Sequence, residues 1–457
     1  MVTRKDRIYN GINKTPRLLV FGYPSKAPQV GGLLWSKRVS DSISKLGVVN
    51  IRNVSSERSI DAKLNTRQIV KNIIPCLIRD SYDAVRGLLT LPQLALLDSW
   101  GEASIILWVL LRVFQPHAKI IIVFHHYEPR ILPDRISEIE SHFSRAVAKR
   151  YNSIIEKLTS IMIRDSDMIL TVSRTSARQL YSLYGITGNN NIKDQDQKNA
   201  PFGSGKIRIV GTGVDKLTID VAAEKDIDFF CIGRIEKLDG IDKIWSALKK
   251  LRPAAKFVMI GRASLTEINH LKSIGIEHKG EVTDKEKLKL YSRAKVFLFP
   301  SGREGFGIAL AESLQLRMSA VIWRLPVFEE LYSESVMAKQ GRVLLVERGN
   351  YKLFAAEALR ALDSYDRRNT TTTTTRRIIS PKPSLSSSSS SLTTTTTTST
   401  TTTTSSPVLS ESKKTAAATT TISVLKLTEE KQEQRREILQ SWEDVAHKVV
   451  KALSELI

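Results

Sequence analysis

The sequence predicts an α/β protein that contains two doubly wound parallel sheets. The first observation is a series of short, continuous apolar runs, which are typical of strands that helices cover on both faces. The second is that helical patterns separate these runs, so that strand, loop and helix alternate along the chain. The third is that the alternation occurs in two sets, divided by a polar stretch at 187–206. A chain of 457 residues, 41% of them hydrophobic, is long enough to form a core in each set.

The apolar runs give the expected strands, and the periodic segments between them give the expected helices. Ligands of such sheets bind at the loops that follow the carboxyl ends of the strands. In the first set, strands are expected at 18–21, 119–124 and 168–172, and helices at 34–46, 136–164 and 175–183. In the second set, strands are expected at 228–232, 256–260 and 295–299, and helices at 242–251 and 284–293.

The composition excludes several classes of protein. With only two cysteines, Cys76 and Cys231, the chain is not a disulfide-stapled secreted scaffold. Its most apolar segment, 105–111, is shorter than the about 20 residues of a bilayer span, so it is either a buried helix or an interfacial contact. Residues 1–17 are polar and basic, and no apolar region typical of a signal peptide follows them. We therefore expect a cytoplasmic protein, dissolved or held at the cytoplasmic face of the membrane.

The charge of the chain is strongly positive. There are 69 Lys and Arg against 47 Asp and Glu, which gives a net charge of +22. Such a charge attracts phosphates on nucleic acid, anionic lipid or a small ligand. Between His142 and Arg164, basic residues strongly outnumber the single acidic residue Glu156. That pattern suits docking on an anionic membrane or an ordinary solvated helix face. Nucleic acid is not expected as a partner, because no recognised binding motif accompanies the charge.

The C-terminal part contains a low-complexity segment. From Ser384 to Ser406 every residue is Ser or Thr except two leucines. This composition cannot bury apolar surface, so we expect a disordered insertion that is a solvated loop, a tether or a segment modified on its hydroxyls. Helical periodicity returns after it. The expected organisation is an N-terminal domain at 16–200, a C-terminal domain at 206–365, the insertion at 366–428 and a final helix at 429–457.

Candidate ligand-binding residues follow the strands of the first set. Gly31 and Gly32 open an expected helix, where paired glycines let the backbone approach a ligand, although an ordinary turn explains them equally well. His125 directly follows the strand 119–124 and can donate a hydrogen bond to a sugar hydroxyl, although it could instead be structural. His126 and Glu128 raise the alternative of a metal site. Adjacent residues of a strand point to opposite faces, so we expect no metal.

Two strands of the second set end in the same Gly-Arg pair. Arg234 follows Gly233 at the end of one strand, and Gly261 occupies the corresponding position one unit later. An arginine at this place is suited to gripping a diphosphate with two parallel hydrogen bonds, and a surface salt bridge is the competing interpretation. This turn is therefore a candidate phosphate site.

The strongest pattern lies in the glycine-rich loop after the last expected strand. A helix is expected to begin near Gly307, so the amides of Gly305, Phe306 and Gly307 form a cradle for an anion, to which the helix dipole adds. Glu304 in the loop and Glu312 in the helix flank the same cleft mouth. Carboxylates accept hydrogen bonds from vicinal hydroxyls, which points to a sugar or ribose in addition to a phosphate.

At these residues the chain resembles the retaining, nucleotide-sugar-dependent glycosyltransferases of family 4, which have the GT-B fold. The segment Phe299–Glu312 is similar to their Glu-x7-Glu motif. The resemblance covers about residues 16–365 and 429–457 and leaves out the Ser/Thr insertion. It implies two Rossmann-like domains that face each other across a cleft, with the last helix crossing back onto the first domain. It rests as well on Val30–Gly32, Phe124–His125, Asp167–Ser173, Ile209–Asp215, Ile232–Asp242 and Ser441–Ala446.

The resemblance also implies roles for individual residues. Glu304 would contact hydroxyls of the transferred sugar, and Glu312 would hold the ribose of the donor. The amides of residues 305–307 would bind the sugar and the diphosphate. Arg234 would neutralise the leaving diphosphate, and His125 would meet the sugar from the opposite domain.

One position departs from the family pattern. The family usually places a lysine five residues after the arginine, where this chain has Asp239. An acid beside a diphosphate would repel it, and Lys237 could substitute for the lysine only if the loop bends differently. The expected function is nevertheless a metal-independent hexosyltransferase without a cofactor, which moves a sugar with retention from a nucleotide-diphosphate sugar to a glycan or lipid-linked acceptor. The alternatives are a catalytically weak sugar-nucleotide-binding subunit and a GT-B sugar-nucleotide epimerase.

Overall fold

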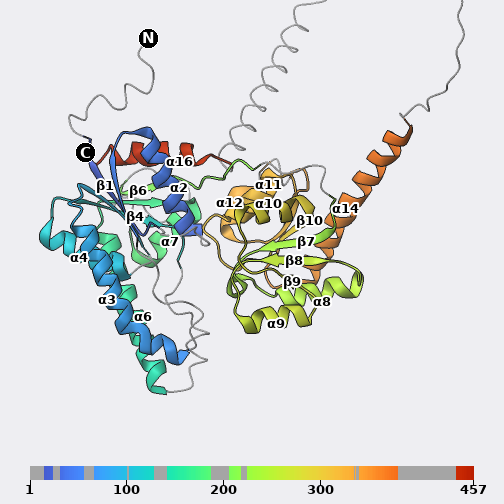
Figure 1. Cartoon of the computed structure of the whole chain (residues 1–457), viewed down its shortest axis with the longest axis horizontal. Coiled ribbons are helices and arrows are strands. Elements are labelled where there is room, and N and C mark those ends of the chain that lie inside the picture. Colours follow the sequence, from blue (N-terminus) through green and yellow to red (C-terminus); the bar gives the residue numbers. More distant parts are fainter. Residues whose placement is uncertain are drawn as a thin grey trace, which may run out of the picture.

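The chain forms two α/β domains, each built around a six-stranded parallel sheet (Figure 1). The strand order is β2-β1-β3-β4-β5-β6 in the first sheet and β12-β11-β10-β7-β8-β9 in the second. This confirms the expected fold class. The computed structural model describes residues 15–23, 31–55, 66–99, 102–127, 142–186, 205–217, 224–333, 335, 339–378 and 439–457.

The first domain places β1 and its neighbours between two layers of helices. Its strands are β1 Arg17–Phe21, β2 Asn50–Val54, β3 Leu94–Asp98, β4 Lys119–Phe124, β5 Met168–Thr171 and β6 Ile207–Ile209. One layer contains α3 Thr66–Leu88, α4 Glu102–Phe114, α6 His142–Asp165 and α7 Arg174–Tyr184, which share one apolar core cluster. The opposite face of the sheet packs on α2 Gly31–Leu46 and α16 Trp442–Leu453.

The second domain repeats this plan around a single large core. Its strands are β7 Ile227–Ile232, β8 Phe257–Ile260, β9 Glu277–His278, β10 Ala294–Phe299, β11 Ser319–Trp323 and β12 Val343–Val346. The helical elements are the short 3-10 helix η2 Ile235–Lys237, α8 Ile241–Leu251, α9 Leu265–Ser273, α10 Asp284–Arg293, α11 Ile308–Gln315, α12 Pro326–Tyr332 and α14 Tyr351–Ile378. Residues at the centre of this core are fully buried aromatic side chains, among them Trp245, Phe297 and Trp323.

The last helix returns to the first domain. Helix α16 lies along α2, as its position on the first lobe in Figure 1 shows. A capping box starts it: Ser441 Oγ accepts from the amide of Asp444, whose carboxylate accepts from the amide of Ser441. Just before it, Gln440 donates to the carbonyl of Val210 at 3.3 Å. Residues 429–438, which we expected to be helical as well, lie outside the described residues.

Two of the expected domain boundaries differ from the structure. Strand β6 begins at Ile207 but pairs with β5 of the first sheet, so the first domain continues past residue 206. The reason is that this short strand finds its hydrogen-bond partners at the free edge of β5. Helix α14 continues to Ile378, past residue 366, where we expected the insertion to begin. A helix once nucleated adds residues cheaply, even weak helix formers such as Thr.

The apolar segment 105–111 is helical and lies within α4. Leu107 and Leu111 are buried against the sheet, whereas Val109 and Val113 of the same helix are exposed. None of the helices in the described part of the chain combines the length and apolar composition that a membrane crossing requires.

Candidate active site

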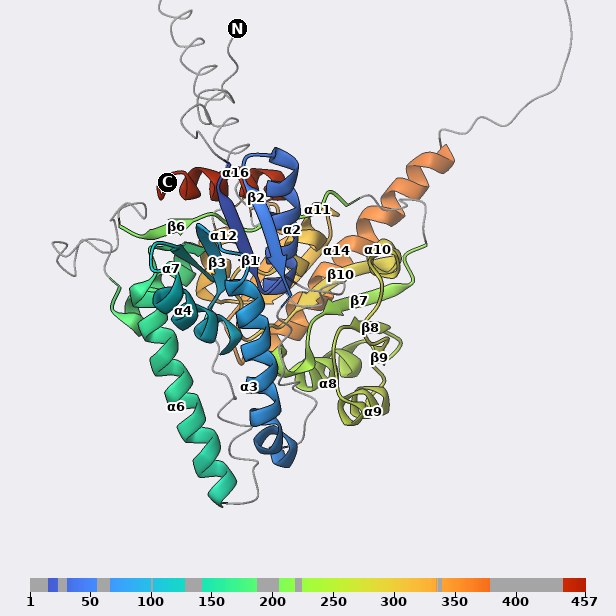
Figure 2. The same cartoon turned by 60° about the vertical axis from the view of Figure 1, so that its left-hand side comes forward.

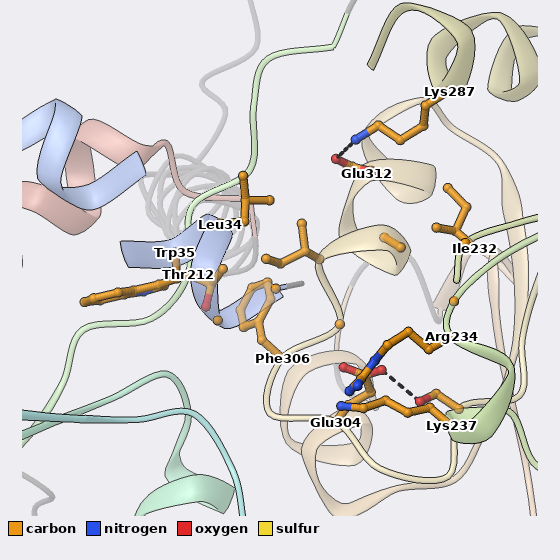
Figure 3. A pocket seen from close by; sticks show the side chains of 18 of the residues that line it. Leu34, Trp35, Thr212, Ile232, Arg234, Lys237, Lys287, Glu304, Phe306 and Glu312 are labelled. Atoms are coloured by element: carbon orange, nitrogen blue, oxygen red, sulfur yellow. Dashed lines mark hydrogen bonds and ion pairs between the residues drawn. The ribbon is translucent and has the colours of Figure 1, made fainter. Parts of the chain in front are cut away.

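A cleft of about 710 Å³ opens between the two domains. Its walls come from the carboxyl ends of strands in both sheets and from the loops after them (Figure 3). Every candidate residue of the sequence analysis lines it: Gly31, Gly32, His125, Gly233, Arg234, Lys237, Gly261, Glu304, Gly305, Phe306, Gly307 and Glu312. Residues from distant parts of the sequence thus meet at one place, which the topology of two parallel sheets explains.

The start of α11 provides backbone donors to this cleft. Gly307 caps the helix in the left-handed conformation, with a φ of 86°, which favours glycine. The first helical hydrogen bond runs from the amide of Ala311 to the carbonyl of Gly307 at 3.1 Å. The amides of residues 308–310 therefore have no partner inside the helix. Together with the helix dipole they favour an anion at this end of the cleft.

Arg234 and Lys237 lie beside this loop because backbone hydrogen bonds join their segment to it. The amide of Gly302 donates to the carbonyl of Lys237 at 2.9 Å, and the amide of Asp239 donates to the carbonyl of Pro300 at 2.8 Å. Figure 3 shows both cationic side chains extending toward the carboxylate of Glu304. Glu304 accepts a hydrogen bond from Ser301 Oγ at 2.8 Å. The site thus combines two cations with an oriented carboxylate.

The first domain contributes both histidines of the pair at the end of β4. The ring of His125 is nearly buried and meets Trp35 edge to face, with 5.6 Å between ring centroids. His126 Nε2 lies 3.4 Å from Lys237 Nζ of the second domain. Both residues line the cleft, so the site offers a second histidine besides His125, to which the resemblance gave the sugar contact. Among the described residues, no group of three or more His, Cys, Asp or Glu side chains is placed to hold a metal ion.

The domains touch at the glycine-rich loop and at a helix end. A Cβ atom added to Gly305 would lie 2.3 Å from the carbonyl oxygen of His125, so only glycine allows this approach. Glu330 of α12 accepts hydrogen bonds from the amides of Arg174 and Thr175 at 2.8 and 2.6 Å, which caps α7 of the other domain. The two domains are therefore in direct contact beside the cleft.

Glu312 is the deeper of the two carboxylates. It is 4% exposed and accepts hydrogen bonds from Lys287 Nζ at 2.8 Å and from the hydroxyl of Tyr291 at 3.1 Å (Figure 3). Burial acts to lower the pKa of Lys287, but the charge and hydrogen bond of Glu312, together with the smaller effect of Asp284, outweigh burial and raise that pKa. Burial, and next the charge of Glu312, raise the pKa of Tyr291 well above its usual value. The two hydrogen bonds thus hold the carboxylate of Glu312 in a fixed direction.

Replacing Lys287 by methionine is expected to lower the free energy of unfolding at pH 8 by about 3 kcal/mol, because Glu312 then loses its buried charge partner. The raised pKa of Lys287 means that its contribution is complete below the ordinary lysine value of 10.5 and is lost as the pH rises through the raised value. Urea unfolding of wild type and variant at pH 8 measures the difference. Lys285→Met, at an exposed position of the same helix, is the control. Equal losses in both variants would contradict this interpretation.

The structure also places Asp239, which departs from the family pattern. Its carboxylate pairs with Arg348 Nε at 2.7 Å and accepts from the hydroxyl of Tyr351 at 3.3 Å. Within the described residues, Asp239 does not line the cleft, whereas Lys237 does. The expected repulsion between Asp239 and a diphosphate is therefore offset by an arginine, and the loop does bend so that Lys237 reaches the cleft.

Replacing Asp239 by lysine is consequently expected to destabilise the fold by about 1 kcal/mol without tightening the binding of nucleoside diphosphates, because the new charge would face Arg348. The double variant Asp239→Lys with Arg348→Asp restores an opposite-charge pair and should recover most of the stability. Thermal unfolding with and without a nucleoside diphosphate measures both effects. Tighter binding in the single variant would show that position 239 faces the ligand after all.

Several residues of the cleft were not among our candidates. They include Arg262, Lys287 and Ser301 in the second domain and Arg38 and Thr212 in the first. Arg262 follows Gly261 in the repeated Gly-Arg pair, so the sequence did contain a signal for it. Lys287 gives no such signal, because it meets Glu312 only through the packing of α10 beside α11.

Comparison with known proteins places this site in a family context. Residues 217–377, which include all of the second-domain strands, match one family model. These residues match glycosyl transferases group 1. A curated relative is the O-antigen chain mannosyltransferase RfbU of Salmonella typhimurium, at 24% identity over 249 residues, or 50% of this chain. The chain spans 64% of the length of that relative.

The structural comparisons concern the fold alone. Sucrose-phosphate synthase from Thermosynechococcus elongatus shares 12% identity and superposes with a TM-score of 0.51 over 80% of this chain and 99% of that protein. TarM superposes over 62% of this chain and 52% of that protein, with a TM-score of 0.44 and 14% identity. The two-domain arrangement is thus the GT-B fold that the resemblance to family 4 glycosyltransferases implied.

Proposed function

We propose that this chain is a glycosyltransferase, which moves a hexose from a nucleotide-diphosphate sugar to an acceptor bound between the two domains. The observation that carries the proposal is the meeting of three features in one cleft. They are the open amides at the start of α11, the cations Arg234 and Lys237, and the two carboxylates Glu304 and Glu312. The group 1 match over the same domain supports this assignment.

The leaving diphosphate is the group that most needs stabilisation. In the proposed mechanism, the amides of residues 305–309, which line the cleft, and the guanidinium of Arg234 surround its growing negative charge. These donors are fixed before the reaction, so they need no reorganisation when the bond breaks. The same set would make the reaction independent of a metal ion, and no cofactor besides the donor sugar takes part.

The two carboxylates would hold the sugar end and the nucleoside end of the donor. Glu304, oriented by Ser301, would accept hydrogen bonds from the hydroxyls of the transferred sugar. Glu312 accepts only two hydrogen bonds in the described structure, one at each oxygen, and each carboxylate oxygen can accept a second one from the ribose. His125, from the first domain, would contact the sugar from the opposite side. Retention of the anomeric configuration is proposed from the resemblance to family 4.

The acceptor would bind against the first domain. The name of the relative, an O-antigen chain mannosyltransferase, supports a glycan acceptor and a mannose-type donor sugar. We propose a lipid-linked or membrane-associated glycan as the acceptor and the cytoplasmic face of the membrane as the place of action. The basic residues of α6, such as Lys149 and Lys157, support a membrane surface as a neighbour of the site.

A donor screen tests this function. Purified full-length protein is incubated with a panel of nucleotide-diphosphate hexoses, with and without lipid extract, and released nucleoside diphosphate is measured. Release that needs the acceptor and falls about 10²-fold or more in Arg234→Ala is the expected result. Binding of a nucleoside diphosphate without release from any donor would favour a binding subunit. Isomerisation of a donor without acceptor would favour an epimerase.

A further inference from the structure

The helical layer of the first domain leaves many large apolar side chains in contact with solvent. Eleven of the sixteen exposed large apolar side chains among the described residues lie between residues 78 and 161. Most of them belong to α3, α4 and α6, which pack side by side on one face of the first sheet. Figure 2 shows α3 and α6 extending well beyond the sheet. Such a concentration marks an interaction surface.

On α3 the exposed side chains form a continuous stripe. Ile78, Tyr82, Val85 and, directly after the helix, Leu89 follow one another at spacings of four, three and four residues, which places them on one side of the helix. Leu89 is 72% exposed and Tyr82 is 65% exposed. The guanidinium of Arg86 lies 5.8 Å from the ring centroid of Tyr82 and is paired with Asp83 at 3.7 Å, so the stripe on α3 is apolar with no net charge from this pair.

On α6 the corresponding stripe alternates basic and apolar residues. Arg150, Ile154, Lys157 and Ile161 have the same spacing of four, three and four, and all four are exposed. The nearby acid Glu156 lies on a different side of the helix and accepts a hydrogen bond from the hydroxyl of Tyr127 at 2.8 Å. The stripe therefore presents positive charge that this acid does not neutralise.

Helix α4 fills the space between these stripes in the same layer. Its Val109, Val113 and Phe114 are exposed, while Arg112 is engaged by Asp165 at 2.6 Å. We call the two stripes and these α4 side chains the helical face. It is apolar along α3 and α4 and carries basic residues along α6. The described acids Asp83, Asp165 and Asp167 are paired with Arg86 and Arg112.

We propose that the helical face docks the protein on an anionic lipid bilayer, with α3, α4 and α6 lying in the plane of the interface. The surface has the composition of interfacial helices: aliphatic side chains and a tyrosine among Arg and Lys, on helices that do not span the bilayer. A charge of +22 over the whole chain draws it to the same surface. This inference rests on the membrane location in the proposed function and names the surface that would make the contact, and it does not depend on the transferase activity.

Vesicle flotation of the full-length protein tests the proposal without any donor sugar. Vesicles of phosphatidylcholine with about 30% phosphatidylglycerol are compared with phosphatidylcholine alone, at about 0.1 M and about 1 M salt. The apolar variant is Tyr82→Ser with Leu89→Ser, and the basic variant is Arg150→Glu with Lys157→Glu. All four positions are exposed, so the fold should persist, which circular dichroism checks.

Matched control variants come from the second domain. Leu251→Ser with Leu265→Ser removes two apolar side chains that are equally exposed, and Lys250→Glu with Lys272→Glu reverses two exposed charges. We expect wild type and both controls to bind anionic vesicles in a salt-dependent way. The affinity of each face variant for anionic vesicles should be lower than that of wild type by about tenfold or more.

Three results would overturn the proposal. The first is equal vesicle binding by wild type and both face variants. The second is wild-type binding that is the same for neutral and anionic vesicles at both salt concentrations. The third is no vesicle binding together with a wild-type dimer in analytical ultracentrifugation that the apolar variant dissociates, which would assign the helical face to a second copy of the chain.

Discussion

Replacing Glu304 by glutamine is expected to reduce sugar transfer by about 10³-fold while the fold and the binding of nucleoside diphosphates remain. The carboxylate stands in a cleft loop, oriented by Ser301 Oγ at 2.8 Å and approached by Arg234 and Lys237. In the proposed mechanism it contacts the transferred sugar, and a neutral amide cannot supply the charge that the reacting carbon needs. The diphosphate is held by other groups, so its affinity should change little.

The measurement is the rate of nucleoside diphosphate release with the donor found in the screen, beside the dissociation constant of the nucleoside diphosphate alone. Ser301→Ala removes the hydrogen bond to Glu304 but keeps the carboxylate, so it serves as a graded comparison. Its rate of nucleoside diphosphate release should fall about tenfold. If Glu304→Gln turned over as fast as wild type, Glu304 would not be the residue that contacts the transferred sugar.

Replacing Gly305 by alanine is expected to reduce turnover about 10²-fold by preventing full closure of the domains. Its added Cβ would stand 2.3 Å from the carbonyl oxygen of His125. This backbone oxygen accepts a hydrogen bond from Ser176 Oγ and so cannot move aside easily. Closure aligns donor and acceptor and expels water, and a small misplacement of the reacting groups is costly.

Small-angle scattering distinguishes this cause from a loss of stability. Gly305→Ala should have a larger radius of gyration than wild type, with only a small fall in melting temperature. Two of the three core clusters lie within one domain, and only the cluster that includes Phe306 and Ala311 spans both. Glu330→Ala, which removes the cap on α7, should open the domains through a different contact. If Gly305→Ala is as compact and as active as wild type, the domain contact seen here is not needed for the reaction.

The buried strands of both sheets could be predicted from the sequence because their apolar runs are continuous. Strand β4 was expected at its observed bounds, and β10 within one residue. Strand β2 was missed because its sequence is polar and most of its residues are exposed at the sheet edge. Strands β3 and β11 are buried and apolar, but a short apolar run cannot be distinguished from a helical segment by periodicity alone.

The residues that line the candidate site could be predicted from the sequence, whereas the contacts that hold them in place could not. The glycine-rich loop and the Gly-Arg turn follow strands directly, so their place at the carboxyl edge is a consequence of topology. The pairs of Lys287 with Glu312 and of Arg348 with Asp239 join residues 25 and 109 positions apart. Only the packed structure brings these residues together. Because Asp239 pairs with Arg348, it does not act on the cleft as the sequence had led us to expect.

A crystal structure of the full chain with a nucleoside diphosphate tests the central claim most directly. Our account predicts terminal phosphate oxygens within hydrogen-bonding distance of the amides at the start of α11 and of the guanidinium of Arg234, and the ribose beside Glu312. A nucleotide bound elsewhere, or with its phosphates turned away from these amides, would contradict the account.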